Sequence, residues 1–257
     1  MKMRKRSASA YQIIILSLAT SLFHRITTLR TLDVSKNNLK SLGEIDRLPN
    51  LKSLNCKENQ IPTLGPISKL SSLQTLLASS NLLGKPTVGV SEAVPTLPVS
   101  LKQMALDHNF FSSVPMSVVS STLTKLEKLD LSFNQLAVLP ADIANLVSLE
   151  ELKVDHNMIV SLPEAMGRLT KLKTLSLKDN SISVTSTIFS PRNPQPLPAS
   201  LFMDTPLIDL NLHGNRLTST ELNQFDGFPV FLKRREKVKT KDLYGGAMTN
   251  YDVCGLE

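Results

Sequence analysis

The sequence contains no tryptophan, few aromatic residues and only two cysteines. Aromatic side chains make up 5% of the chain, so any buried core has to be built from aliphatic residues. Cys56 and Cys254 do not supply the disulfide framework that stabilises many small secreted domains. No asparagine begins an N-x-[ST] glycosylation sequon. Together these absences favour a protein of the cytoplasm over an extracellular one.

The chain also lacks the short motifs of several common enzyme classes. It has no P-loop, no H-E-x-x-H zinc motif and no G-x-G-x-x-G dinucleotide-binding motif. We therefore expect no catalytic residues, no metal and no cofactor.

The net charge of +7 is unevenly distributed along the chain. Residues 1–6 and 233–241 hold ten of the 29 lysines and arginines and only one acidic residue. The body between them is close to neutral, so we expect no nucleic-acid partner. The basic segment 233–241 is expected to be a solvated helix end, with a nuclear-import or acidic-membrane patch as the alternative.

An internal repeat is the strongest pattern in the sequence. The frame L-x-x-L-x-L-x-x-N-x-L occurs eight times, for example as LEKLDLSFNQL from Leu126. Its x-L-x-L part has the alternation of a short strand, and one repeat has to stack on the next to bury its leucines. We predict that the asparagine of each repeat bonds to backbone groups of the turn that follows the strand. These asparagines form a structural ladder at Asn37, Asn59, Asn81, Asn109, Asn134, Asn157, Asn180 and Asn215.

The frame resembles the leucine-rich repeat family over residues 29–217. The resemblance implies an α/β fold, a curved solenoid with short parallel strands on the concave face. It also implies 3-10, helical or extended turns on the convex face and a helical C-terminal cap. The first two repeats, 22 residues apart, are similar to those of phosphatase-regulating repeat proteins. Later repeats, 23 residues apart with L-P-x-x-[IM]-x-x-L, are similar to plant intracellular Ras-group-related proteins.

Segments outside the frame define the remaining organisation. Insertions at 84–100 and 183–206, rich in Pro, Ser and Thr, are expected to loop off one face. Thr218 or Ser219 is a candidate N-cap for a helix containing ELNQF, within a C-terminal cap over 218–241. Residues 242–257 are expected to be a flexible tail. The order H-G-N-R-L-T, F-D-G-F and a basic end is similar to small intracellular proteins of the leucine-rich repeat-containing protein 57 kind. That resemblance assigns the cap role to Phe225, Gly227, Phe228 and Phe231.

The N-terminal segment has two interpretations. Residues 1–19 have the charged start, apolar run and small-residue end of a secretory signal. The repeat frame also fits this region from Ile13 to Phe23, with Ser21 at the asparagine position. We favour a disordered basic lead at 1–12 and a degenerate cap repeat at 13–28, because terminal repeats are atypical. Secretion through residues 1–19 stays the alternative.

Two apolar residues stand at positions that should face water, Leu77 and Phe133. Phe133 has charged neighbours in the adjacent repeats, which is the anatomy of an interface anchor with a polar rim. The predicted partner site is Leu77, Asp107, His108, Asp130, Phe133, Lys153, Asp155 and His156. The two Asp-His pairs are two strands apart, about 10 Å. Zinc ligands lie about 2.1 Å from the metal, so we do not expect a metal site there.

The function that we predict is a non-catalytic protein–protein interaction module. It would be a monomeric intracellular scaffold or adaptor that binds a signalling partner on its concave face. By family resemblance that partner is a small GTPase or its effector. The alternative is a regulatory subunit of a Ser/Thr phosphatase or a similar enzyme. A secreted or membrane-associated recognition protein is the third reading, but it predicts paired cysteines, sequons and a 20-residue apolar span. The sequence lacks all three, so we expect no stable membrane insertion.

Overall fold

The computed structural model describes residues 28–86, 93–184, 195–242 and 254–255. The chain divides into two compact units, residues 1–110 and 111–257. The predicted basic lead, all but the last residue of the predicted N-terminal cap repeat and the middle of each insertion lie outside the described residues.

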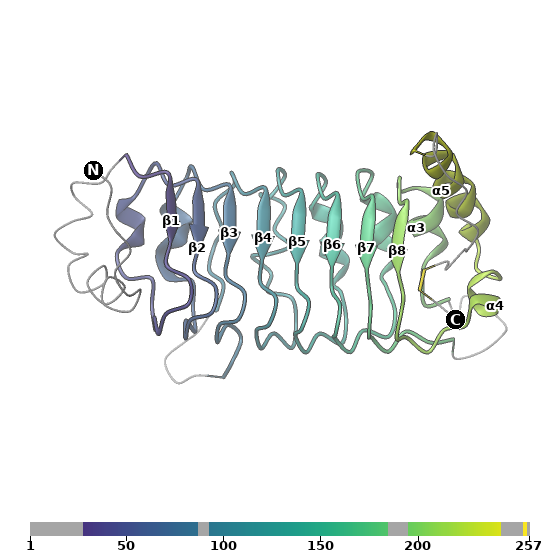
Figure 1. Cartoon of the computed structure of the whole chain (residues 1–257), viewed down its shortest axis with the longest axis horizontal. Coiled ribbons are helices and arrows are strands. Elements are labelled where there is room, and N and C mark those ends of the chain that lie inside the picture. The colour runs from purple at the N-terminus through teal and green to yellow at the C-terminus, as the bar shows by residue number, and fades with distance from the viewer. Residues whose placement is uncertain (1–27, 87–92, 185–194, 243–253, 256–257) are drawn as a thin grey trace. The chain divides into compact units, whose positions relative to one another are not determined.

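The first unit contains four short parallel strands that pair in chain order, each one repeat further along the sequence (Figure 1). The middle residue of each strand points inward, so Leu54 pairs with Leu76 and both are fully buried. Short 3-10 helices return the chain after the first two strands. The elements are β1 (Thr31–Asp33), η2 (Ile45–Arg47), β2 (Ser53–Asn55), η3 (Gly65–Lys69), β3 (Thr75–Leu77) and β4 (Gln103–Ala105).

The second unit repeats this arrangement with four more parallel strands in chain order (Figure 1). Pro140 and Pro163, the prolines of the L-P-x-x motifs, immediately precede its two 3-10 helices in extended conformation. Proline fixes φ and has no N–H to lose, so it suits this entry into a helical turn. The elements are β5 (Lys128–Asp130), η4 (Ala141–Asn145), β6 (Glu151–Lys153), η5 (Glu164–Arg168), β7 (Thr174–Ser176) and β8 (Asp209–Asn211). These short parallel strands and 3-10 turns are those of a leucine-rich repeat solenoid.

From Asn59 onward, the asparagine of a repeat joins its own turn to the preceding repeat. The Nδ2 of Asn157 donates to the carbonyls of Val154 and Asp155, at 3.0 and 3.1 Å, within its own repeat. It also donates to Leu131 O at 3.1 Å, while its Oδ1 accepts from Leu136 N at 3.0 Å, both in the repeat before. Equivalent sets of bonds form around Asn59 in the first unit and Asn180 in the second. Each amide thus satisfies backbone groups that the buried turn removes from water.

A cluster of phenylalanines closes the C-terminal end of the second unit. Phe225, Phe228 and Phe231 are buried, and the rings of Phe228 and Phe231 pack on Phe202, with those of Phe202 and Phe228 5.5 Å apart, edge to face. The helices that carry or frame the cluster are α3 (Ala199–Met203), α4 (Ser219–Leu222) and α5 (Phe228–Asp242) (Figure 1). Aromatic residues, scarce elsewhere, are thus concentrated where the last repeat has no successor to cover it.

A capping box and a glycine with positive φ determine where these helices begin and how closely they pack. Thr218 is the N-cap of α4 and forms a capping box with Glu221. The helix ends at Leu222, so only the first part of the ELNQF segment is helical. At Gly227 φ is +80°, and a Cβ there would lie 2.9 Å from Met203 Cγ and 3.0 Å from Ala199 O. Glycine is therefore required both by the conformation and by the close approach of α3.

Two segments outside the repeat frame are more ordered than the sequence indicates. The second insertion was expected to loop off one face, but part of it forms α3, and Leu197, Leu201 and Phe202 are buried. In the segment expected to be a flexible tail, Cys254 is buried and its carbonyl accepts from Leu212 N at 2.8 Å. At these positions the side chains fill space at the end of the stack, which gives them a reason to be ordered.

Asn157→Ala removes one amide of the ladder and leaves several turn groups without a partner. Each unsatisfied buried polar group costs about 1–3 kcal/mol, so we expect a loss of about 3 kcal/mol in the free energy of unfolding, measured in urea. Asn223→Ala, at an exposed position after α4, is the matched control. It should change stability by less than about 0.5 kcal/mol. Equal small effects of the two variants would show that the ladder contributes little.

Cys56 should be unreactive in the folded protein. Its side chain is fully buried, and burial raises the pKa of the thiol to about 12. Thiol reagents attack the thiolate, which is almost absent at pH 8 for such a group. Mass spectrometry after alkylation should find Cys56 unmodified in native buffer and modified in guanidinium chloride. Rapid native modification would contradict the burial of this side chain.

Candidate functional site

The residue before each ladder asparagine adopts a left-handed backbone conformation. This turn directs its N–H to the next repeat, as Phe133 N donates to Asp155 O and His156 N to Lys178 O, each at 2.8 Å. A residue other than glycine pays about 1–2 kcal/mol for this conformation. The column comprises Lys36, Glu58, Ser80, His108, Phe133, His156, Asp179 and Gly214, with φ between +50° and +74°. Most of these residues are polar or small, which suits a solvent-exposed turn. Phe133 is bulky and aromatic, and it is the residue least expected in a left-handed conformation.

Phe133 begins a row of side chains along this column of the second unit. The side chain is 42% exposed, and its ring stacks on that of His156 with centroids 4.0 Å apart and planes 21° apart. On the far side of the row, His156 Nε2 lies 3.3 Å from Asp179 Oδ2. The exposed ring of Phe133 thus packs on His156, which in turn contacts the carboxylate of Asp179.

Gly214 completes the row and leaves space for Asp179. A Cβ at this position would lie 1.9 Å from Asp179 Oδ1. Sequence reasoning did not include Asp179 or Gly214 in the site. The sequence feature that could have indicated them is Gly214, because every other residue of this column carries a side chain.

Two carboxylates of the predicted site have structural roles as well. Asp130 Oδ1 accepts from Ser132 N at 3.0 Å, and Asp155 Oδ1 accepts from Lys178 N at 2.7 Å. The N–H of Asp155 in turn donates to the hydroxyl of buried Ser132 at 3.2 Å. These bonds fix the direction of both carboxylates as the chain leaves each strand.

Lys153 lies in a row of alternating charges across two strands. Glu151 contacts Lys128 at 2.8 Å and Lys153 at 3.0 Å. The hydrogen bond from Lys128 is the main cause of a lowered pKa for Glu151, and the bond to Glu151 is the main cause of a raised pKa for Lys153. Both shifts favour the ionised forms of Glu151 and Lys153 at neutral pH.

The structure divides the predicted partner site between the two units. Leu77 ends β3 and is half-buried, while Asp107 accepts from the Ser79 hydroxyl and lies 3.0 Å from His108 Nδ1, all in the first unit. The other five residues, which we call the Phe133 patch, belong to the second unit. The Phe133 patch consists of Asp130, Phe133, Lys153, Asp155 and His156.

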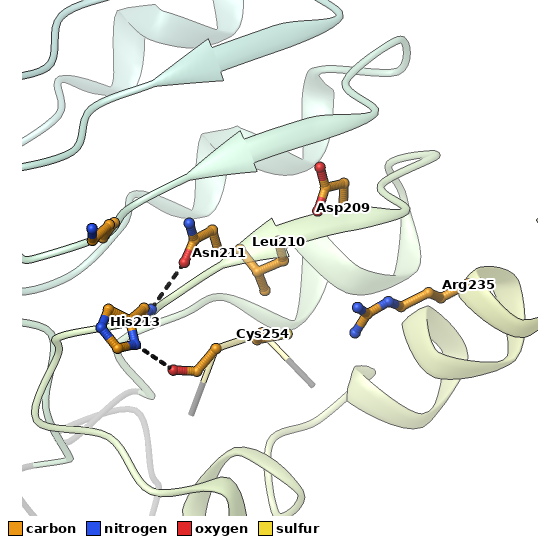
Figure 2. Close-up of a pocket in the computed structure, with 8 residues that line it drawn as sticks. Asp209, Leu210, Asn211, His213, Arg235 and Cys254 are labelled. Atoms are coloured by element: carbon orange, nitrogen blue, oxygen red, sulfur yellow. Dashed lines mark hydrogen bonds between the residues drawn. The ribbon is translucent and has the colours of Figure 1, made fainter. Parts of the chain in front are cut away.

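A hollow of about 360 Å³ lies at the C-terminal end of the second unit, and sequence reasoning missed it (Figure 2). Its walls come from β8, α5, the turns after β7 and β8, and the packed residues Cys254 and Gly255. The lining residues are Lys178, Asp209, Leu210, Asn211, His213, Arg235, Cys254 and Gly255. No signal in the repeat frame indicates it, because Arg235, Cys254 and Gly255 lie outside the frame.

Over the part of the chain that the structure describes, no group of three His, Cys, Asp or Glu side chains is arranged to hold a metal ion. No helix in those same ranges combines the length and apolar character needed to cross a membrane.

Phe133→Gly should give a more stable protein than Phe133→Ala. Both variants lose the contact with His156, but only glycine adopts the left-handed conformation without steric cost. We expect a difference of about 1 kcal/mol in the free energy of unfolding, the reverse of the usual preference for alanine. Urea denaturation of the two variants measures it, and a more stable alanine variant would show that the backbone here is unstrained.

Comparisons with known proteins agree with the geometry. Residues 99–159 match a model of the family described as leucine rich repeat, and residues 27–65 match one described as leucine rich repeats, two copies. A probable serine/threonine-protein kinase, roco5, of Dictyostelium discoideum is 50% identical over 44 residues. That match covers 17% of this chain and 2% of the kinase.

Solved structures with the same fold come from bacteria and from a receptor complex. A Leptospira interrogans LRR protein is 28% identical with a TM-score of 0.56, covering 77% of this chain and 52% of that protein. Internalin C2 of Listeria monocytogenes is 23% identical with a TM-score of 0.59, covering 80% of each chain. A chain from a complex of latrophilin 3, Unc5D and FLRT2 (LRR) is 23% identical with a TM-score of 0.58, covering 77% of this chain and 58% of that one.

The matched segments contain β1, β2 and β4 to β6, and ladder asparagines of both units. The closer resemblance to the leucine-rich repeat-containing protein 57 kind or to plant Ras-group-related proteins is not established by these matches. The strands, the asparagine bonds and the matched segments together identify the chain as a leucine-rich repeat protein.

Proposed function

We propose that this protein is a non-catalytic interaction module that binds a protein partner through the Phe133 patch. The observation that carries the proposal is the conformation of Phe133, a bulky, half-exposed residue held at φ +54°. Strained backbone at an exposed position persists where the side chain has a use, and burying an aromatic ring in a partner is such a use.

The surroundings of Phe133 fit an interface anchor. His156 stacks beneath the ring and limits its motion, so little side-chain freedom remains to be lost on binding. Asp130, Lys153 and Asp155 carry fixed charges nearby, which suits a polar rim that sets orientation and specificity. The patch therefore combines a preorganised aromatic centre with charges of both signs.

The family context supports a role in binding. Leucine-rich repeats are typically interaction modules, and their stacked strands present an extended surface. The FLRT2 chain with the same fold was solved in complex with latrophilin 3 and Unc5D. We further propose an intracellular scaffold or adaptor with a signalling partner such as a small GTPase or its effector. Two free, buried cysteines support the cytoplasm as its location.

A regulatory subunit of a Ser/Thr phosphatase is the second candidate. The observation that favours it is the 22-residue spacing of the strand register in the first unit, from Leu32 to Leu54 to Leu76. In this case the partner docks on the strand face of the first unit, where Leu77 is half-buried at the end of β3.

Phe133→Ala should weaken partner binding by tenfold or more, about 1.4 kcal/mol, because it removes the anchor. Affinity capture from cell extract with quantitative mass spectrometry measures the loss for each bound protein. Val138→Ala, another exposed apolar residue of the second unit, is the matched control and should bind as the wild type does. A Phe133→Ala protein that binds every partner with wild-type affinity would contradict the proposal. If only Leu77→Ala weakens binding, and the protein no longer captured is a phosphatase catalytic subunit, the second candidate is established instead.

A further inference from the structure

The first unit carries an excess of positive charge that the second unit lacks. Its described residues, 28–86 and 93–110, contain nine lysines and arginines and five acidic residues. The described residues of the second unit, 111–184, 195–242 and 254–255, contain fourteen of each. The excess positive charge of the described repeats therefore belongs to the first unit.

Backbone hydrogen bonds align one residue of each repeat just before the strands of the first unit begin. Lys52 N donates to Arg30 O, and Gln74 N donates to Lys52 O, each at 2.8 Å. Lys102 N continues the series with a bond to Gln74 O at 2.8 Å. Because neighbouring parallel strands lie about 4.8 Å apart, the side chains of this row follow one another at that interval. The row, which we call the basic rim, consists of Arg30, Lys52, Gln74 and Lys102.

The residues that directly follow the basic rim are neutral. They are the first residues of β1 to β4 and offer hydroxyl or amide groups: Thr31, Ser53, Thr75 and Gln103. These two columns of the first unit therefore contain cations and neutral polar groups but no carboxylate.

The same two columns of the second unit hold paired charges. Glu150 and Lys173 stand in the column of the basic rim, and their charged groups lie 2.8 Å apart. In the next column Lys128 and Glu151 form a contact of the same length, 2.8 Å. Opposite charges on neighbouring strands stabilise a sheet, whereas like charges destabilise it. The basic rim thus carries a cost in stability that the second unit avoids.

The described carboxylates of the first unit are engaged away from the basic rim. Asp33 accepts from the Ser35 hydroxyl at 2.6 Å and from Asn55 Nδ2 at 2.9 Å. The others contact basic side chains outside the rim, in the pairs Glu44–Arg47, Asp46–Lys69, Glu58–Lys36 and Asp107–His108. Arg30 and Lys52 are exposed, and within the described ranges neither of them forms an ion pair.

We propose that the basic rim binds the acidic face of a helix in a protein partner. Glutamates at i and i+4 of a helix lie about 6 Å apart, close to the strand interval of about 4.8 Å. Arg30 and Lys52 bind two such carboxylates, and the amide of Gln74 donates to a third. Arginine is well suited to this role because of its fork of N–H donors. The basic rim belongs to the first unit and does not depend on the function proposed for the Phe133 patch.

Phosphate groups of nucleic acids or membranes fit the basic rim less well than a protein partner does. Binding to nucleic acid commonly uses about 6–10 phosphate contacts. Recognition of anionic lipids commonly uses clusters of about 4–8 lysines and arginines. The rim has three cations, flanked by hydroxyl and amide groups that bond equally well to carboxylates. A few carboxylates on one helix face match this number.

The test is an NMR titration of the full ¹⁵N-labelled chain with the helical peptide acetyl-(Glu-Ala-Ala-Ala)₄-amide at low salt. We expect saturable shifts of the Lys52, Ser53 and Gln74 amides with a Kd of about 1 mM, as for a few exposed ion pairs. The matching peptide with glutamine in place of glutamate should bind about tenfold more weakly, because it lacks the charge-assisted bonds. An isomer with its glutamates spread around the helix should bind about threefold more weakly, because fewer of them reach the rim together.

Variants of equal charge separate the basic rim from net charge. Arg30→Gln and Lys52→Gln should each weaken the glutamate peptide about fivefold. Lys40→Gln removes one exposed charge of the same unit outside the rim and should change the Kd by less than about twofold. Phe133→Ala should leave the Kd unchanged, because the patch belongs to the second unit.

Lys52→Glu provides a readout that a structural role for the lysine would move in the opposite direction. It places a carboxylate beside Arg30, the arrangement that Glu150 and Lys173 have in the second unit. Peptide binding should be lost, while the urea midpoint of unfolding should stay equal or rise, because opposite charges replace like charges. A lower midpoint would show that Lys52 serves the fold, which would contradict the proposal.

Three further results would overturn the proposal. The first is the absence of saturable shifts along the basic rim with the glutamate peptide. The second is equal weakening by Lys40→Gln and Lys52→Gln, which would reduce the effect to net charge. The third is tighter binding of single-stranded DNA or of phosphatidylserine vesicles through the same amides, which would assign the rim to phosphates.

Discussion

The buried asparagine amide is the interaction on which the repeat architecture depends. Each repeat turns sharply after a strand of only three residues, and the turn places backbone N–H and C=O groups where water cannot reach them. The amide of Asn157 supplies donors to three carbonyls and an acceptor to one N–H. An aliphatic residue would fill the same volume but leave these groups unpaired, so the repeat can vary elsewhere and still requires asparagine here.

The same turn restricts how much of the strand face is free to evolve a binding surface. The position before the asparagine is left-handed in every repeat, which favours small or polar residues. One position earlier, Ser132 is buried and accepts from Asp155 N, so it is part of the scaffold. The left-handed backbone therefore disfavours an aromatic residue in this column, and for this reason the presence of Phe133 points to a function for its side chain. Its neighbour His156 reduces the disadvantage by stacking on the ring.

The features that the sequence could predict are those that repeat. Eight copies of one frame defined the strands and the asparagine positions, because each copy meets the same physical demand. Phe225, Phe228 and Phe231 were also foreseeable as cover for the last repeat, since they are apolar residues clustered just beyond the frame. Arg234, which binds the carbonyls of Phe202 and Leu207, and Cys254, which pairs with Leu212, were not. They act once each, between segments distant in sequence, and no periodicity marks them. The row from Phe133 to Asp179 was missed in part for a similar reason, because side-chain contacts along a column depend on rotamers and on the space above Gly214.

The bonds of the ladder also have a direction. Asn180 Oδ1 accepts from Ile159 N, and Asn215 Oδ1 accepts from Ile182 N, so each repeat is completed by the one that follows it. Removing a repeat from the C-terminal side exposes an unpaired donor in the repeat that remains, while removal from the N-terminal side leaves that donor satisfied. Within the second unit, unravelling is therefore asymmetric. Unravelling from the C-terminal end is the costlier direction, because it leaves an N–H without its acceptor, and the phenylalanine cluster and Arg234 add to this cost by holding that end closed.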